Sequence, residues 1–130
     1  MSLNKKSFYI TTTIPYVNAN PHIGFAFELV QADAVARYQR LLGRKVFFST
    51  GTDEHGQKIW EASQKEGKNI QDYVDYYAKK FSDLKNLLNL SNNNFIRTTS
   101  REHIEAAQEF WNLCDAKGDI YKKKYKGLYC

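Results

Sequence analysis

Alternating apolar and polar blocks divide the chain into predicted strands and helices. Ser7–Thr13 is a short, β-branched and largely apolar run, which is typical of a strand in a sheet covered on both faces. Lys45–Gly51 and Asn94–Thr99 are predicted to form two further strands, and Ile120–Tyr125 a fourth. Four strands, spaced widely enough for helical crossovers, favour a parallel arrangement.

Helical spacing begins after Pro21, where a loop rich in proline and asparagine ends. The apolar positions that recur at steps of three and four predict one helix up to Gly43, with a buried stripe of Phe27, Val30, Ala34, Tyr38 and Leu41. Thr52 or Asp53 is expected to cap a shorter helix that ends at Gly67.

Two more helices follow, each with a polar residue at its start. Asn69 is expected to cap the first, whose apolar stripe is Ile70, Tyr73, Tyr77, Phe81, Leu84 and Leu88. Ser100 caps the second, which ends at Gly118 and carries Ile104, Ala107, Trp111 and Cys114 on one face. Trp60 and Trp111 are both expected in the core, and Cys114 is expected to be a buried thiol.

This order predicts an α/β fold of the Rossmann-like kind, a mostly parallel sheet with flanking helices. In such sheets ligands bind outside the carboxyl ends of the strands. Residues 14–24 follow the first strand and residues 51–56 follow the second, so the fold should bring these two segments together. The sequences of these two segments are also the least typical of purely structural elements.

Composition says only a little about the class of protein. The 130 residues are 42% hydrophobic and 25% charged, as in one globular domain, and no apolar stretch reaches membrane-spanning length. The net charge of +5 favours contact with polyanions, although the lysine run at 122–124 and 126 is more typical of a solvated face. Two cysteines imply no disulfide framework and favour a reducing compartment, so a cytoplasmic protein is expected.

The segment after the first strand carries candidate phosphate chemistry. His22 and Gly24 open a helix, whose first backbone N–H groups and positive dipole end favour an anion. Gly24 lets a phosphate or a ring approach the backbone, and His22 can donate to a phosphate as its charge grows. From the residues alone, a helix-start histidine and a packing glycine explain the pattern about as well.

The residues Pro15, Tyr16, Asn18 and the run from Pro21 to Gly24 resemble the ATP-binding signature of class I aminoacyl-tRNA synthetases, in the form seen in methionyl enzymes. The signature normally ends in a second histidine, but Phe25 occupies that place. Phenylalanine cannot donate a hydrogen bond to a phosphate. The resemblance therefore implies ATP binding at His22, Gly24 and Phe25, with His22 as the catalytic donor and Phe25 able only to pack.

A second segment, Thr50–Gly56, is similar to a motif of the methionyl enzymes. The resemblance implies that Asp53 binds the α-ammonium group of methionine, with Ile14, through its backbone, and Tyr16 completing the methionine site. A carboxylate at a strand end suits that task, while a plain helix cap is the alternative. His55 and His103 are expected to be exposed or capping.

The resemblance runs from Phe8 to Cys130 and implies methionine–tRNA ligase activity with methionine, ATP–magnesium and tRNA as partners, and neither DNA nor a membrane. Residues 1–130 would then be the nucleotide-binding half of the catalytic domain, with a connective insertion starting near 126–130. The family's second signature, a lysine-serine-lysine loop, is absent from these residues, so the fragment alone is expected to be inactive. No metal site is expected here, and zinc only in the connective region that Cys130 would begin.

The alternative is a non-catalytic nucleotide- or RNA-binding module that reuses the half-fold. The missing lysine signature favours it, whereas the intact Asp53 segment argues against it. Reading the coding frame beyond Cys130 is the cheapest observation that separates the two.

Overall fold

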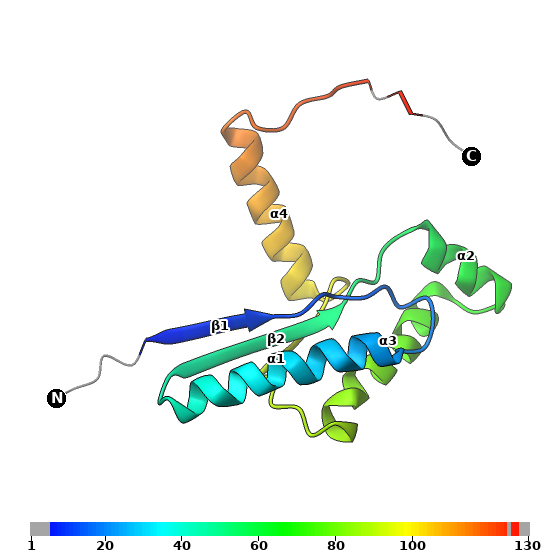
Figure 1. The fold of residues 1–130 in the computed structure, drawn as a ribbon. Coiled ribbons are helices and arrows are strands. Elements are labelled where there is room, and N and C mark those ends of the chain that lie inside the picture. Colours follow the sequence, from blue (N-terminus) through cyan, green and yellow to red (C-terminus); the bar gives the residue numbers. More distant parts are fainter. Residues whose placement is uncertain (1–5, 125, 128–130) are drawn as a thin grey trace. The chain divides into compact units, whose positions relative to one another are not determined.

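The computed structural model describes residues 6–124, 126 and 127 (Figure 1). The chain divides into two compact units, Met1–Ser100 and Arg101–Cys130, and each is treated by itself. The first holds β1 (Ser7–Thr11), α1 (Ile23–Leu41), β2 (Lys45–Thr52), α2 (Gln57–Lys65), α3 (Ile70–Leu87) and β3 (Asn94–Arg97). The second holds α4 (Arg101–Ala116).

The three strands form one sheet in the order β1-β2-β3, and both pairings are parallel. Phe8 lies beside Val46 in the first pairing, and Ser49 lies beside Asn94 in the second. Gly51 permits the second pairing, because a Cβ atom there would lie 2.0 Å from the carbonyl oxygen of Ile96. The α/β, Rossmann-like prediction is confirmed.

Helix α1 covers the sheet through small residues. Ala32 and Ala36 pack against Val46 and Phe48 of β2, with the partly buried side chains of β1 beside them. The predicted stripe of Phe27, Val30, Ala34, Tyr38 and Leu41 is wrong, because all five residues are exposed. Alanines let the helix lie close to the sheet, and the bulkier stripe therefore faces away.

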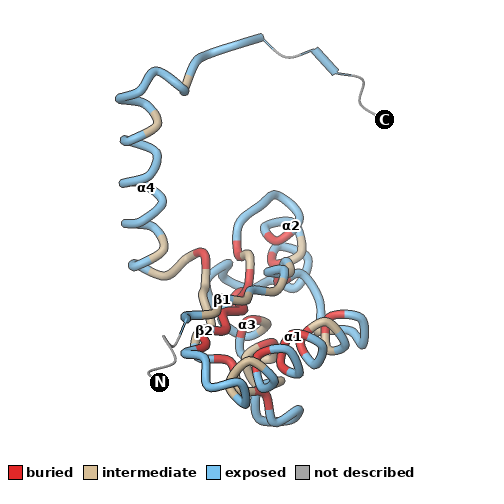
Figure 2. The backbone as a smooth tube through the Cα atoms, turned by 60° about the vertical axis from the view of Figure 1, so that its left-hand side comes forward, coloured by how far each residue is buried: buried red, intermediate tan, exposed pale blue. Residues whose placement is uncertain are grey.

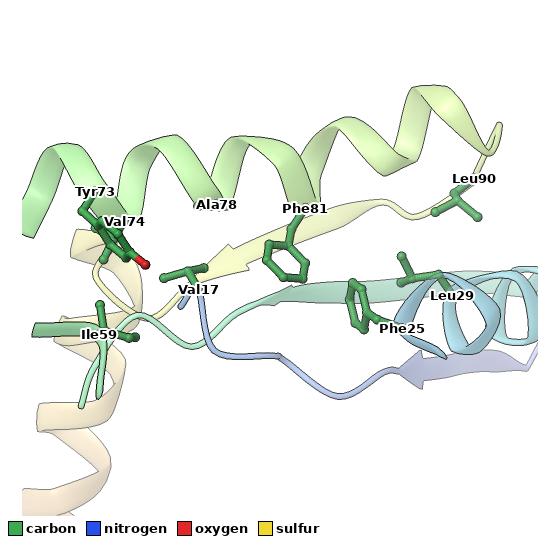
Figure 3. Packing of buried hydrophobic residues seen from close by; sticks show 9 residues of the cluster. All are labelled: Val17, Phe25, Leu29, Ile59, Tyr73, Val74, Ala78, Phe81 and Leu90. Atoms are coloured by element: carbon green, nitrogen blue, oxygen red, sulfur yellow. The ribbon is translucent and has the colours of Figure 1, made fainter. Parts of the chain in front are cut away.

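The main core lies between α1 and α3 (Figure 3). Phe25 and Leu29 of α1 point toward Phe81 of α3, and Phe25 meets Phe81 edge to face with ring centroids 5.4 Å apart. The predicted stripe of α3 is largely confirmed, since Tyr73 and Phe81 are buried and Tyr77 and Leu84 pack against the same cluster. Asn69 caps α3 as expected, accepting from the backbone N–H of Gln71 at 2.8 Å.

The opposite face of the sheet is more open. Tyr9 and Phe47 are neighbours in register and stack with centroids 5.7 Å apart, yet they are 66% and 46% exposed. In Figure 2 buried residues lie in β2 and along α1, α2 and α3, and α4 carries none. The expectation that the first strand lies in a sheet covered on both faces is therefore not met, because only one face of β1 is partly buried in the described residues.

Two local predictions are wrong. Residues 120–124 form no strand, and Tyr125 lies outside the described residues; adjacent lysines at 122–124 are all exposed and pair with no described strand. Neither Thr52 nor Asp53 caps α2, because β2 runs through Thr52 and the helix begins only after Gly56.

The predicted burial of Trp60, Trp111 and Cys114 is not observed in full. Trp60 is 54% exposed and Trp111 is 60% exposed, and α4, all of which is described, buries no residue. Cys114 is half-buried. No helix in the described ranges is both long enough and apolar enough to cross a bilayer.

Asp33 ties α1 to the loop before β3, and this contact makes stability depend on pH. The carboxylate accepts from the Ser91 N–H at 2.7 Å and from Arg37 Nε at 2.5 Å. Burial alone would raise the pKa of Asp33, but the hydrogen bonds from Ser91 and Arg37 outweigh it and hold the pKa below its ordinary value. The stabilisation is therefore present above the unfolded pKa of about 3.9 and is lost as the pH falls through the lower folded pKa.

We expect the difference in unfolding free energy between wild type and Asp33→Asn to be greatest above about pH 5 and to shrink toward pH 3. Urea unfolding across that range measures it. Glu109→Gln, at an exposed position of α4, is the control and should show no such trend. A difference that stays constant with pH would mean that the Asp33 charge contributes nothing.

Candidate active site

The loop after β1 and the end of β2 meet as a short continuation of the sheet. Tyr16 and Asp53 form an isolated parallel bridge. The Asp53 N–H donates to the carbonyl of Pro15 at 2.9 Å, and the Val17 N–H donates to the carbonyl of Asp53 at 3.4 Å. The expected meeting of the two segments is confirmed.

Glu28 fixes the start of that loop from α1. Its two carboxylate oxygens accept from the Thr13 N–H and from the Thr13 hydroxyl, both at 2.7 Å. Thr13 directly precedes Ile14, whose side chain is 38% exposed. The backbone of Ile14 is thus held between a helix anchor on one side and the bridge to β2 on the other.

His22 is the N-cap of α1, and its side chain works as the cap. The Gly24 N–H donates to His22 Nδ1 at 3.0 Å. A neutral imidazole that accepts at Nδ1 carries its proton on Nε2, and no described residue accepts from Nε2. His22 therefore performs the capping role and still keeps a free donor.

Gly24 makes room for that cap. A Cβ atom at position 24 would lie 2.9 Å from His22 Cε1 and 3.0 Å from Nδ1, which is tighter than real contacts allow. The Gly24 N–H is also occupied by the imidazole, so it is not one of the free helix N–H groups that the sequence suggested for an anion. The missing side chain of Gly24 therefore leaves the space that the His22 ring occupies.

Phe25 points inward. Its side chain is 5% exposed and packs against Phe81, not Phe27, which is itself 61% exposed. Phe25 also lines a cavity of about 230 Å³ together with Tyr16, His22 and Phe81. The ring can therefore form the floor of a site beside His22, while most of its surface belongs to the core.

A larger hollow of about 500 Å³ lies on the other side of Tyr16, lined by His55, Gly56 and the start of α2. Tyr16 is 56% exposed and borders both this hollow and the smaller cavity. Gly56 is the N-cap of α2 and has a φ of 125°. Because it has no side chain, it cannot cap the first N–H groups of the helix with one. Tyr16 therefore lies between the cavity beside His22 and the hollow beside α2.

Asp53 is half-buried beside this loop. Its Oδ1 accepts from the His55 N–H at 3.3 Å and lies 3.4 Å from the Thr98 hydroxyl. No donor among the described residues reaches Oδ2. Asp53 thus presents one engaged and one unengaged carboxylate oxygen next to Tyr16.

The sequence did not single out the ion pair behind Asp53. Glu54 is buried, and its two oxygens accept from Arg97 Nε at 2.6 Å and from Arg97 Nη2 at 2.8 Å. Arg97 also bonds Asp75 of α3 at 2.5 Å, and this hydrogen bond holds the pKa of Asp75 below its ordinary range. A charged residue directly after Asp53, with an arginine at a strand end 43 positions later, is the only sequence signal for it.

In the described part of the chain, no three histidine, cysteine, aspartate or glutamate side chains are placed together to hold a metal ion. Cys130, the residue expected to begin a zinc-binding region, lies outside the described residues. The chemistry available here is hydrogen bonding and charge: an imidazole donor, a carboxylate and a fixed loop backbone.

Known proteins resemble this chain along nearly all of its length. The family described as tRNA synthetases class I (M) matches residues 8–130. Methionine–tRNA ligases of Rhizobium meliloti and Thermotoga maritima are 52% and 51% identical over 94% and 95% of the chain, which spans 24% and 20% of their lengths. A structure of Mycobacterium tuberculosis methionyl-tRNA synthetase in complex with methionyl-adenylate is 43% identical, with a TM-score of 0.87 over 89% of this chain and 23% of that one.

Proposed function

Because the chain belongs to the family of class I tRNA synthetases of the methionyl type, we propose that it forms the nucleotide- and methionine-binding half of a methionine–tRNA ligase. The proposal concerns the whole enzyme, since the chain spans about a quarter or less of the curated relatives named above. A connective insertion would begin near 126–130, of which residues 128–130 lie outside the described part.

The proposed reaction has two steps. A carboxylate oxygen of methionine attacks the α-phosphorus of ATP, the bond to pyrophosphate breaks, and methionyl-adenylate forms. The methionyl group then passes to the terminal ribose of tRNA and AMP leaves. For the first step the protein must hold two substrates in line and stabilise the charge that develops on the phosphate.

One observation carries the proposal: the bridge between Tyr16 and Asp53 places a carboxylate beside the loop that leads into the His22 helix. Asp53 would accept the methionine ammonium group at its unengaged Oδ2. The Ile14 backbone and Tyr16 would contact the rest of the amino acid. His22 would donate from Nε2 to the nucleotide phosphates, with Gly24 and Phe25 shaping the nucleotide side.

Magnesium would enter with ATP as part of the substrate, and the described residues contain no cluster suited to hold it alone. The tRNA would contact parts of the enzyme beyond this chain, and the net charge of +5 favours its contact with this chain as well. The low cysteine content supports a cytoplasmic site of action.

Methionine-dependent ATP–pyrophosphate exchange by the full-length protein tests the proposal, with His22 as the probe. His22→Asp keeps a capping oxygen, because aspartate is a good N-cap, but it has no donor, whereas His22→Ala loses the cap as well as the donor. A hydrogen bond to a charged group contributes about 1.5–3 kcal/mol, so we expect both variants to lower exchange by roughly 10- to 100-fold.

If His22→Asp retained full exchange, His22 would act only as a helix cap. If the wild-type protein bound ATP but catalysed no methionine-dependent exchange, the alternative of a non-catalytic nucleotide- or RNA-binding module would hold. The two results are separate, since the first concerns one residue and the second concerns the activity itself.

A further inference from the structure

The carboxyl end of β3 holds the segment that contains Asp53. Glu54 is 3% exposed, and besides Arg97 its carboxylate accepts from the Thr52 hydroxyl at 2.8 Å and from the Thr99 hydroxyl. A buried carboxylate is stable only when its oxygens are well satisfied, and here donors from both strand ends satisfy it. Glu54 is therefore fixed, and with it the backbone one residue after Asp53.

Thr98 connects this fixed point to Asp53 itself. Its hydroxyl oxygen accepts from the Glu54 N–H at 2.8 Å, and the Thr98 N–H donates to the Thr52 carbonyl at 3.2 Å. The Thr98 side chain is buried, so its hydroxyl proton must find an acceptor within the protein. The available acceptor is Asp53 Oδ1, at 3.4 Å.

The 3.4 Å separation is long for an O–H···O bond, so this hydrogen bond is weak. It favours one orientation of the Asp53 carboxylate without holding it rigidly. The His55 N–H approaches the same oxygen, at 3.3 Å. Both protein donors thus meet Oδ1, and none in the described chain meets Oδ2. Because both donors bind Oδ1, the orientation of Oδ2 is set before any cation binds.

We propose that Thr98, locked in place by the Glu54–Arg97 ion pair, is the positioning residue that aims Asp53 Oδ2 at the ammonium group of the amino-acid substrate. This inference rests on the proposed function of Asp53. It assigns to β3 a part in substrate selection: recognition of the ammonium group depends on a hydroxyl that does not touch the substrate.

The test compares methionine with 4-(methylthio)butanoate, which lacks only the amino group. In the full-length protein, KM for methionine in pyrophosphate exchange is measured together with the inhibition constant of the desamino analogue. We expect Thr98→Val, which keeps the shape and removes the hydroxyl, to raise the methionine KM about 5- to 10-fold, the size of one lost hydrogen bond. The inhibition constant of the analogue and the KM for ATP should change less than about twofold.

Two further substitutions grade the effect. Thr98→Ser keeps the hydroxyl and should restore the wild-type ratio of the two constants. Thr98→Cys has a weak donor and should be intermediate. The ratio does not depend on the folded fraction, so it remains informative if Thr98→Val is unstable, and Thr98→Cys takes its place if that variant does not fold.

Ser63→Ala is the matched control. Ser63 is also a fully buried hydroxyl, and it donates to the Trp60 carbonyl at 2.7 Å within α2. Its loss should leave the ratio unchanged. Equal weakening of methionine and the analogue by Thr98→Val, or an unchanged methionine KM, would overturn the positioning role, whereas absence of exchange in the wild type would overturn the proposed function instead.

Discussion

Asp53→Asn in the full-length protein is expected to weaken methionine binding by about 2–5 kcal/mol, or roughly 30-fold to several thousand-fold. Asparagine has the shape of aspartate and keeps an oxygen for the His55 N–H and the Thr98 hydroxyl. It would turn an amide NH₂ toward the ligand in place of Oδ2. The substrate ammonium group would then lose its counter-charge and face a donor.

Calorimetric titration with methionine and separately with ATP measures the effect, and ATP affinity should change little. Asp83→Asn is a suitable control, since Asp83 pairs with Lys79 on the surface of α3. Unchanged methionine affinity would leave Asp53 as a strand-end residue with no ligand. A purely capping role for a helix is already ruled out by geometry, because α2 begins at Gln57.

Phe25→Ala is expected to lower the free energy of unfolding by about 3–5 kcal/mol, as truncation of a buried aromatic does. The ring lies between α1 and α3, in edge-to-face contact with Phe81 (Figure 3). Its removal leaves a cavity that two packed helices cannot easily close. Adenylate formation per folded molecule should change only modestly, because the ring has no polar group to offer a phosphate.

Phe27→Ala is the matched control, two residues further along the same helix and largely exposed, and should cost no more than about 0.5 kcal/mol. Denaturant unfolding gives the stabilities, and rapid-quench kinetics on folded protein give the chemical step. A folded Phe25→Ala variant that forms adenylate a thousandfold more slowly would show a direct catalytic role for the ring. Strong acceleration by Phe25→His would show that the native site lacks a donor.

Local patterns predicted most elements of this fold. The β-branched runs at β1 and β2 and the cap at Asn69 were identified correctly, because each depends on neighbours in sequence. The buried face of α1 was not, because this helix carries large apolar residues on two faces. Phe25 and Leu29 compete with Phe27 and Val30, and periodicity alone does not say which pair meets α3.

The site shows the same division. The meeting of the Tyr16 and Asp53 segments follows from the rule for parallel strand ends, so it could be predicted. The pairing of Glu54 with Arg97 could not, because it joins positions far apart whose side chains look individually like surface charges. The sequence offers a helix-start role for His22 as the alternative to a functional role, and the geometry allows one side chain to do both.

The bridge between Tyr16 and Asp53 also has an entropic consequence. A loop whose N–H and C=O groups are already paired with a strand end has few backbone conformations left to lose when a ligand arrives. The ordering cost that usually reduces the affinity of loop sites is thus met during folding, before any encounter. Heat-capacity changes on binding at this loop would then report the surface that the ligand covers, without a contribution from coupled folding.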